Sequence, residues 1–189
     1  MGKAVLISIQ PKWCELIASG KKTVEVRKTK PKLLTPFKAY IYCTQGKDLL
    51  TSVNGKVNKP NEIVIDLTTN SEIQELNGKV IGEFVCDWMT GLKADNLVQA
   101  YYNNTKDTCL TDEEIKKYAN GKKLYYWHIS DLVIYNKPKD LIEFYIWKKC
   151  HSCRDTGYES TACMYDEDCK VPAVITKPPQ SWCYVEDLL

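Results

Sequence analysis

The sequence predicts an α+β protein, a small mixed β-barrel with short helices packed at its rim. Strand-like runs predominate, the helix-like segments are short, and strands do not alternate with helices as in a βαβ array. The 189 residues are 44% hydrophobic and 26% charged, which is typical of one folded domain with a proper core. We expect that domain to span residues 1–147, and a cysteine-rich extension, residues 148–189, to return and pack on the barrel.

The first elements follow closely on one another. A β-branched run at residues 3–9 predicts the first strand. A short helix should follow, because Pro11 suits the first helical position and Gly20 suits the end of the helix. Alternating apolar and polar side chains then predict strands at residues 22–28 and 37–44.

The middle of the chain begins with an exposed excursion. Residues 45–61 are rich in Gly, Asn, Lys and Pro, and the Asn54-Gly55 pair suits a hairpin turn. Two more strands are expected after this excursion, at residues 62–67 and 78–90.

A second helix is predicted by its capping residues. Thr111 can cap the first turn, Glu114 completes a capping box, and Gly121 ends the helix. The last predicted elements are a long, bent aromatic strand and a short helical turn (123–136, bending near Ser130-Asp131; 138–145).

The net charge of +2 hides a strong asymmetry along the chain. Residues 1–60 carry twelve lysines and arginines against three aspartates and glutamates, whereas the rest of the chain is acidic. A basic half of this kind often marks a surface for nucleic acid or another polyanion. The alternative is that the lysines are unevenly distributed and serve only solubility.

The chain shows no targeting or membrane-spanning segment. Its N-terminal apolar run is too short for a secretory signal peptide, and no stretch approaches the roughly 20 apolar residues of a membrane span. We therefore expect a cytoplasmic protein with no membrane partner.

The stretch GKKTVEVRK, residues 20–28, sets one carboxylate among four cationic side chains. Glu25 and Arg27 lie two residues apart on the predicted strand, so they share a face and can pair laterally. Val24 and Val26 then occupy the opposite face. Two interpretations stay open, a solvated face with a local ion pair or one wall of a site that handles an anion.

Four residues of this stretch also fit the signature of a known domain. Gly20, Lys22, Glu25 and Arg27 match G-x-K-x-x-E-x-R, and the blocks YIYCT, YYWHISDLVIYNKPKDL and PPQSWCYVE follow in order. With these blocks, residues 3–187 resemble the stand-alone ASCH domain proteins of bacteria and phages, members of the PUA-like superfamily. The resemblance implies a PUA-like β-barrel whose cleft is thought to bind RNA or a modified nucleobase.

The candidate residues for nucleic-acid binding are Lys12, Trp13, Gly20, Lys21, Lys22, Glu25, Arg27 and Trp127. Gly20 would let a ligand approach the backbone, and Lys22 would meet a phosphate or a carbonyl oxygen. Trp13 and Trp127 would stack on unpaired bases. Each of these residues also has a structural interpretation: a helix-ending glycine, a solvated lysine or a core aromatic.

Some proteins similar around this motif are amidohydrolases acting on acylated cytidine, and there the motif lysine is catalytic. Lys22 matches that lysine, which needs a free amine to act as nucleophile or base. However, Glu25 occupies the position of the assisting threonine, and an adjacent carboxylate stabilises the ammonium form. The assisting helical glutamate stays open among Asp112, Glu113 and Glu114. Hydrolysis is therefore the alternative hypothesis.

The cysteines form a separate pattern. The nine cysteines are concentrated in the extension, and Cys150, Cys153, Cys163 and Cys169 are spaced C-x2-C-x9-C-x5-C. The first pair has the spacing of a zinc knuckle, so these four thiolates could hold a structural zinc. The alternative is a set of reduced thiols in an irregular extension. No other cofactor is required.

The leading hypothesis is therefore a nucleic-acid-binding module for RNA or a modified nucleotide, with no chemistry of its own. An amidohydrolase with Lys22 as its catalytic residue is the first alternative. A protein-interaction scaffold organised by zinc is the second.

Overall fold

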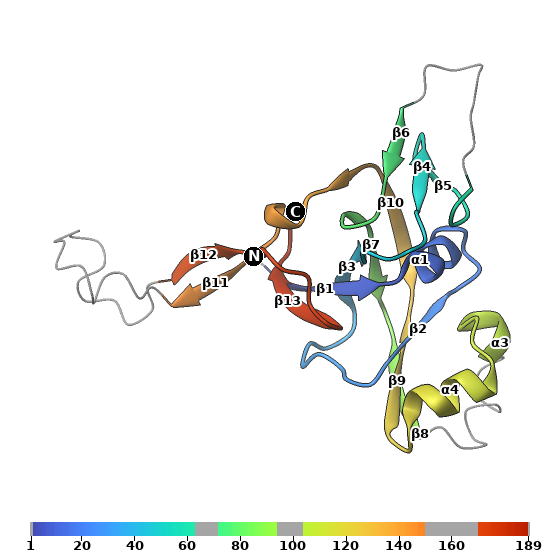
Figure 1. The fold of residues 1–189 in the computed structure, drawn as a ribbon. Coiled ribbons are helices and arrows are strands. Elements are labelled where there is room, and N and C mark those ends of the chain that lie inside the picture. Colours follow the sequence, from blue (N-terminus) through green and yellow to red (C-terminus); the bar gives the residue numbers. More distant parts are fainter. Residues whose placement is uncertain (1, 63–71, 94–103, 150–169, 189) are drawn as a thin grey trace, which may run out of the picture.

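The computed structural model describes residues 2–62, 72–93, 104–149 and 170–188 (Figure 1). Strands predominate and the helices are short, so the predicted α+β class is confirmed. The helices are α1 (Pro11–Ala18), α3 (Asn104–Asp107), α4 (Asp112–Ala119) and the 3-10 turn η1 (Leu141–Glu143).

The main sheet has five strands in the order β10-β7-β3-β1-β13. These strands are β1 (Lys3–Ile9), β3 (Phe37–Cys43), β7 (Val80–Cys86), β10 (Ser130–Lys139) and β13 (Trp182–Glu186). β1 pairs in parallel with β3 on one side and antiparallel with β13 on the other. Its odd-numbered residues pack into one hydrophobic cluster and its even-numbered residues into another, so β1 is buried on both faces.

A second sheet has the strand order β2-β9-β8. The chain passes directly between this sheet and the main sheet at two places. Its strands are β2 (Val24–Arg27), β8 (Met89–Lys93) and β9 (Lys123–His128). The chain bends near Ser130-Asp131, as predicted. Asp131, at the start of β10, has a left-handed φ of 45°. The passage from β7 to β8 divides the predicted strand at residues 78–90 into two.

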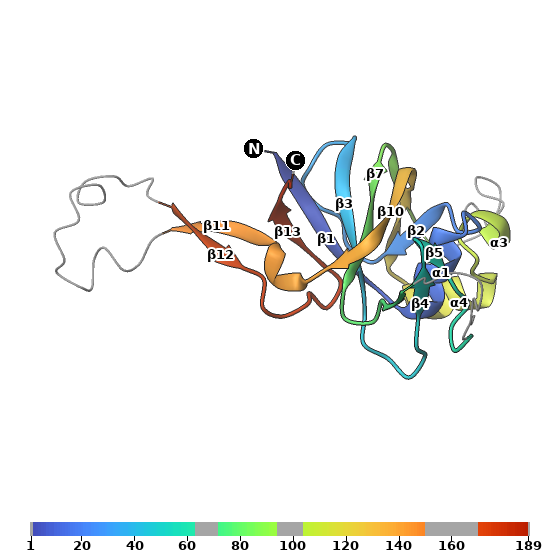
Figure 2. The ribbon, with the colours of Figure 1, turned by 90° about the horizontal axis from the view of Figure 1, so that it is seen from above.

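Two smaller sheets extend from this body. One is the order β5-β4-β6, built from Thr51–Val53, Lys56–Val57 and Ile73–Glu75, and its first hairpin turns at Asn54-Gly55 as predicted. The other pairs β11 (Tyr145–Lys149) with β12 (Lys170–Val174) and projects away from the main sheet (Figure 2).

The prediction of a closed barrel is wrong for the strands that the structure describes. These strands form four separate sheets, and no ladder joins β1 to β2. The reason is that β13 occupies the free edge of β1, while β2 is only four residues long and forms its ladder with β9. The two sheets therefore stay open between β1 and β2.

Helix α4 covers one face of the β2–β9 sheet. Val24 and Val26 of β2 pack there against Ile115 and Ala119 of α4. The predicted capping box is confirmed, since the Thr111 side chain accepts from the Glu114 amide and the Glu114 carboxylate accepts from the Thr111 amide. The helix ends at Asn120 and Gly121, which both have positive φ.

Three predictions fall wholly or largely outside the described residues. They are most of the strand at 62–67, the zinc cluster of Cys150, Cys153, Cys163 and Cys169, and the greater part of the extension that holds it. Within the described ranges, no group of three or more His, Cys, Asp or Glu side chains is arranged to hold a metal ion. None of the described helices is both long enough and apolar enough to cross a membrane.

Candidate functional site

A cleft of about 950 Å³ lies between β1 and β2, where the two sheets stay open. Its walls come from β1 and α1, from β2, from the end of β3, from α4 and from the segment before β13. The lining residues are Ser8, Ile9, Gln10, Trp13, Lys22, Glu25, Val26, Arg27, Lys28, Tyr42, Thr44, Gln45, Leu110, Glu114, Lys117, Tyr118, Pro178, Pro179 and Gln180.

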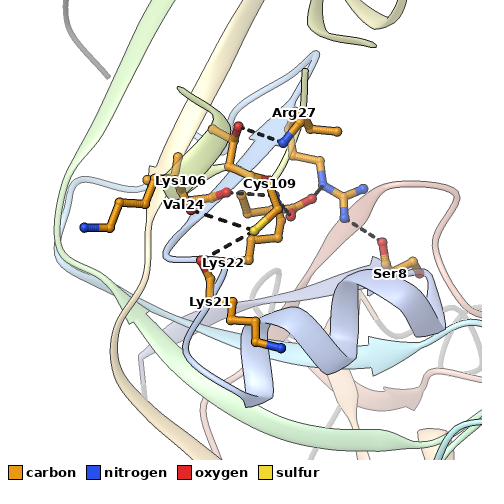
Figure 3. A network of polar contacts seen from close by, with 10 residues as sticks. Ser8, Lys21, Lys22, Val24, Arg27, Lys106 and Cys109 are labelled. Carbon is orange, nitrogen blue, oxygen red and sulfur yellow. Dashed lines mark hydrogen bonds and ion pairs between the residues drawn. The ribbon is translucent and has the colours of Figure 1, made fainter. Parts of the chain in front are cut away.

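Arg27 bridges the opening between β2 and β1. Its Nε lies 2.9 Å from Glu25 Oε1, which is the lateral pair that the strand spacing predicted. Its Nη2 donates to the carbonyl oxygen of Ser8 at 2.6 Å (Figure 3). Its Nη1 lies 3.5 Å from the Ser181 hydroxyl, at the outer limit of a hydrogen bond, so this nitrogen retains donor capacity.

Lys22 is almost completely buried, with 2% of its surface exposed. Its Nζ donates to the carbonyl oxygens of Val24 at 2.8 Å and Thr108 at 2.7 Å, and lies 3.4 Å from Glu25 Oε2. Two of its three N–H groups are therefore used in hydrogen bonds, and a carboxylate lies close to the nitrogen. Lys22 lines the cleft, but it also fastens the loop after α3 to the start of β2 (Figure 3).

The Glu25 carboxylate lies between two cations. It contacts the Arg27 guanidinium through one oxygen and the Lys22 ammonium through the other. Glu25 is 7% exposed and Arg27 is 9% exposed, so these charges are poorly solvated. Two cations against one anion leave the floor of the cleft with one positive charge in excess, and an anionic ligand would compensate it.

Trp13 is the cleft aromatic that the first helix supplies. It is half-buried, it packs against the main core, and it lines the cleft. The Nζ atoms of Lys12 and Lys22 lie 4.5 and 5.3 Å from its ring centroid. Lys12 itself is exposed and does not line the cleft.

Two further residues of the motif lie beside the cleft rather than in it. Lys21 is exposed, and its Nζ is 3.9 Å from Glu15. Gly20 has a φ of +72° directly after α1, and a Cβ added to it would meet no atom within 4 Å. The positive φ explains the glycine as the end of the helix, which was one of its two interpretations.

Trp127 has to be corrected as a candidate for base stacking. It pairs with Glu25 across the β2–β9 ladder, but its side chain is 0% exposed. Its ring packs edge-on against Phe37, with centroids 5.6 Å apart, and near Trp182 at 6.2 Å. A ring enclosed in this way cannot stack on a base, so Trp127 is a core residue.

Helix α4 supplies cleft residues that the sequence reasoning did not select. Glu114, Lys117 and Tyr118 line the cleft, whereas Asp112 and Glu113 do not. Glu114 had been noted only as a capping residue and as one of three acidic candidates. Lys117 and Tyr118 could have been found from helical spacing, because they follow Glu114 by three and four residues on the same face.

The segment before β13 closes the cleft from the opposite end of the chain. Pro178, Pro179 and Gln180 line it, and the Ser8 hydroxyl donates to the Pro179 carbonyl oxygen at 2.6 Å. The sequence signal for this wall was the block PPQSWCYVE, which had been noted for its resemblance and not for a role in the site.

Burial raises the pKa of two groups in the elements that form the cleft, Cys14 on α1 and Tyr118 on α4. Burial raises the pKa of the Cys14 thiol well above its ordinary value, and the neighbouring Cys43 adds to that shift. Burial also raises the pKa of the Tyr118 hydroxyl, although Arg27 opposes the shift. Because a thiol reacts as its thiolate, Cys14 is a packing residue and not a nucleophile.

Comparisons with known proteins agree with this geometry. The family model of the ASCH domain matches residues 7–54. The structure of an ASCH protein from Zymomonas mobilis superimposes with a TM-score of 0.55 at 17% identity, covering 97% of this chain and 87% of that chain. The chain has the ASCH fold. A tyrosine-to-phenylalanine mutant of the same protein gives a TM-score of 0.50 at 16% identity, covering 97% and 90%.

The resemblance to stand-alone ASCH proteins is thereby confirmed. A search of curated proteins gave no match. The segment that matches the ASCH model contains Trp13, Lys22, Glu25 and Arg27. The walls formed by α4 and by residues 178–180 lie outside it, so the structure alone describes this part of the cleft.

Proposed function

We propose that the cleft binds RNA or a modified nucleotide and that the protein acts as a binding module. The observation that carries this proposal is the buried charge at its floor, where Lys22 and Arg27 outnumber Glu25. ASCH domains are generally thought to bind RNA, which agrees with the proposal. A phosphate group supplies the negative charge that such a floor lacks.

The size and lining of the cleft favour a ligand of about one nucleotide. Its volume of about 950 Å³ lies within the range of roughly 300–1,000 Å³ that small-molecule sites occupy. Trp13 offers a half-exposed ring for stacking, and three amide side chains, Gln10, Gln45 and Gln180, offer both donors and acceptors. This combination suits a flat base with polar edges joined to a phosphate.

Binding of nucleoside monophosphates by calorimetry tests the proposal, with two neighbouring lysines of α4 as a matched pair. Lys117 lines the cleft and Lys116 does not, and both are exposed. Lys117→Ala should weaken binding about fivefold to tenfold, while Lys116→Ala should bind as the wild type does. The wild-type affinity should also fall as salt is added. No binding of any nucleotide, or equal losses in both variants, would contradict the proposal.

One observation favours a second candidate function, hydrolysis of acylated cytidine, and another opposes it. Glu114 is the member of the acidic trio that lines the cleft, so an assisting carboxylate is available. However, the Lys22 amine already donates to Val24 and Thr108 and contacts Glu25, so it would have to give up these contacts to reach a substrate. The test is release of free cytidine from acylated cytidine, and a rate no faster than the uncatalysed reaction would exclude this candidate.

A further inference from the structure

Three exposed lysines beside the cleft rest on tyrosine rings. The Nζ of Lys28 lies 4.7 Å from the ring centroid of Tyr118. The Nζ atoms of Lys30 and Lys123 lie 5.9 and 5.6 Å from the ring centroid of Tyr125. Among the described residues, none of these three ammonium groups forms an ion pair with a carboxylate. Their charge therefore stays available to an external anion.

Two of these five residues belong to the cleft, and a third lies opposite a cleft residue. Lys28 and Tyr118 form part of its lining. Tyr125 lies directly opposite Arg27 in the β2–β9 ladder, so the Tyr125 ring and the Arg27 side chain share one face of that sheet. Lys30 and Lys123 lie beyond them on Tyr125. We call this group of Lys28, Lys30, Tyr118, Lys123 and Tyr125 the lysine–tyrosine strip.

Positive charge is concentrated at the outer end of the strip, at a ladder position where like charges are unfavourable. Lys93 lies directly opposite Lys123 in the β8–β9 ladder, and like charges in that position destabilise a sheet. Two positions further in, Gly91 lies opposite Tyr125, and an added Cβ there would collide with the Lys123 side chain. The absence of a side chain at Gly91 therefore lets Lys123 lie across the sheet toward Tyr125.

We propose that the lysine–tyrosine strip binds the phosphodiester backbone of a single-stranded nucleic acid that continues out of the cleft. This inference rests on the proposed function, because it places one nucleotide in the cleft and the following ones on the strip. Lysines without carboxylate partners meet the phosphates, and the partly exposed Tyr125 ring offers a surface on which a base can stack. A single strand fits better than a duplex, since the cleft takes a flat base free of its partner.

The test compares ligands of increasing length on matched variants. Fluorescence anisotropy would give the affinity of single-stranded oligouridylates of two, four and eight nucleotides, and calorimetry that of uridine monophosphate. The double variant Lys30→Ala with Lys123→Ala removes two charges from the strip. The control Lys56→Ala with Lys59→Ala removes two exposed lysines from the segment around the β4–β5 hairpin. Circular dichroism would verify that all variants are folded.

The strip predicts an effect of length. The wild type should bind the octamer more tightly than the monophosphate, and the strip variant should lose roughly tenfold on the octamer and nothing on the monophosphate. Its dependence of log K on log salt should be shallower by about 1.4, which corresponds to two lost phosphate contacts on a single strand. The control variant should bind every ligand as the wild type does.

The contrary outcomes separate the strip from the cleft. The role of the strip is contradicted if the monophosphate binds but affinity does not rise with the length of the oligonucleotide. It is also contradicted if the control variant loses as much affinity for the octamer as the strip variant does. In both cases the proposed function of the cleft stands. If no nucleotide or oligonucleotide binds, both fail. If polyglutamate competes with the octamer at equal charge concentration, the strip attracts any polyanion and the assignment to nucleic acid is wrong.

Discussion

Arg27 Nη2 lies 2.6 Å from the carbonyl oxygen of Ser8, so one side chain joins β2 to β1 where no strand ladder does. The two sheets stay open on either side of this connection, and the cleft lies at that opening. The residue that joins the two sheets thus also lines the cleft, where its Nη1 retains donor capacity.

Arg27→Lys should lower the free energy of unfolding by about 2 kcal/mol. A lysine lacks the planar fork of the guanidinium, so it cannot contact Glu25 and Ser8 at the same time. Urea unfolding measures the loss. Lys28→Ala is the control, since the adjacent lysine is exposed and its removal should change stability by less than about 0.5 kcal/mol. Equal stability of Arg27→Lys and wild type would show that the bridge is dispensable.

Lys22→Met should lower the free energy of unfolding by about 3 kcal/mol. The change removes the hydrogen bonds to the carbonyl oxygens of Val24 and Thr108 and leaves the buried Glu25 carboxylate with a single cation. Lys21→Met removes the neighbouring lysine, whose side chain is 60% exposed, and should cost almost nothing. If the two variants unfold at the same urea concentration, Lys22 has no structural role.

Gly20→Ala and Gly78→Ala separate a backbone effect from a ligand effect. Both glycines have positive φ, +72° and +79°, so each substitution should cost roughly 1 kcal/mol of stability. Only at Gly78 would the new Cβ collide with Gln45, which lines the cleft. We therefore expect weaker nucleotide binding in Gly78→Ala alone, measured by calorimetry. A loss of binding in Gly20→Ala would instead support a ligand approaching that backbone.

Stability should fall in acid because of Asp187. Burial raises its pKa, but hydrogen bonds from Lys38 and Tyr40 outweigh burial and hold the pKa below its ordinary value. A depressed pKa contributes stability above the ordinary value near 4, and this contribution is lost as the pH falls through the folded-state pKa. Urea midpoints measured from pH 6 to pH 2 should fall less steeply in Asp187→Asn than in wild type. An equal fall of the urea midpoint with pH in the variant and the wild type would contradict this prediction.

Local spacing was sufficient to predict much of the fold. The pair of Glu25 and Arg27 follows from a two-residue separation on a strand, and the start of α4 follows from the Thr111 and Glu114 capping box. The same rules failed for Trp127. Alternation shows that it shares a face with Glu25, but not that this face passes from the cleft into the core between the two residues.

Long-range pairing accounts for what local spacing missed. Whether the sheets close depends on which strand reaches the edge of β1, and β13 reaches it from the far end of the sequence. The place of Lys117 and Tyr118 in the cleft depends likewise on how α4 docks beside β2. Helical spacing puts Lys117 and Tyr118 on one face with Glu114, but it does not show which part of the molecule that face meets.

The pairing of β1 with β13 sets an order of events during folding. Lys3 pairs with Glu186, so the first strand gains its second neighbour only when residues far along the sequence reach it. Contacts of such sequence separation form slowly. The wall of Pro178, Pro179 and Gln180 arrives with the same strand. The finished cleft therefore forms only after this long-range pairing, and binding competence follows the docking of β13 onto β1.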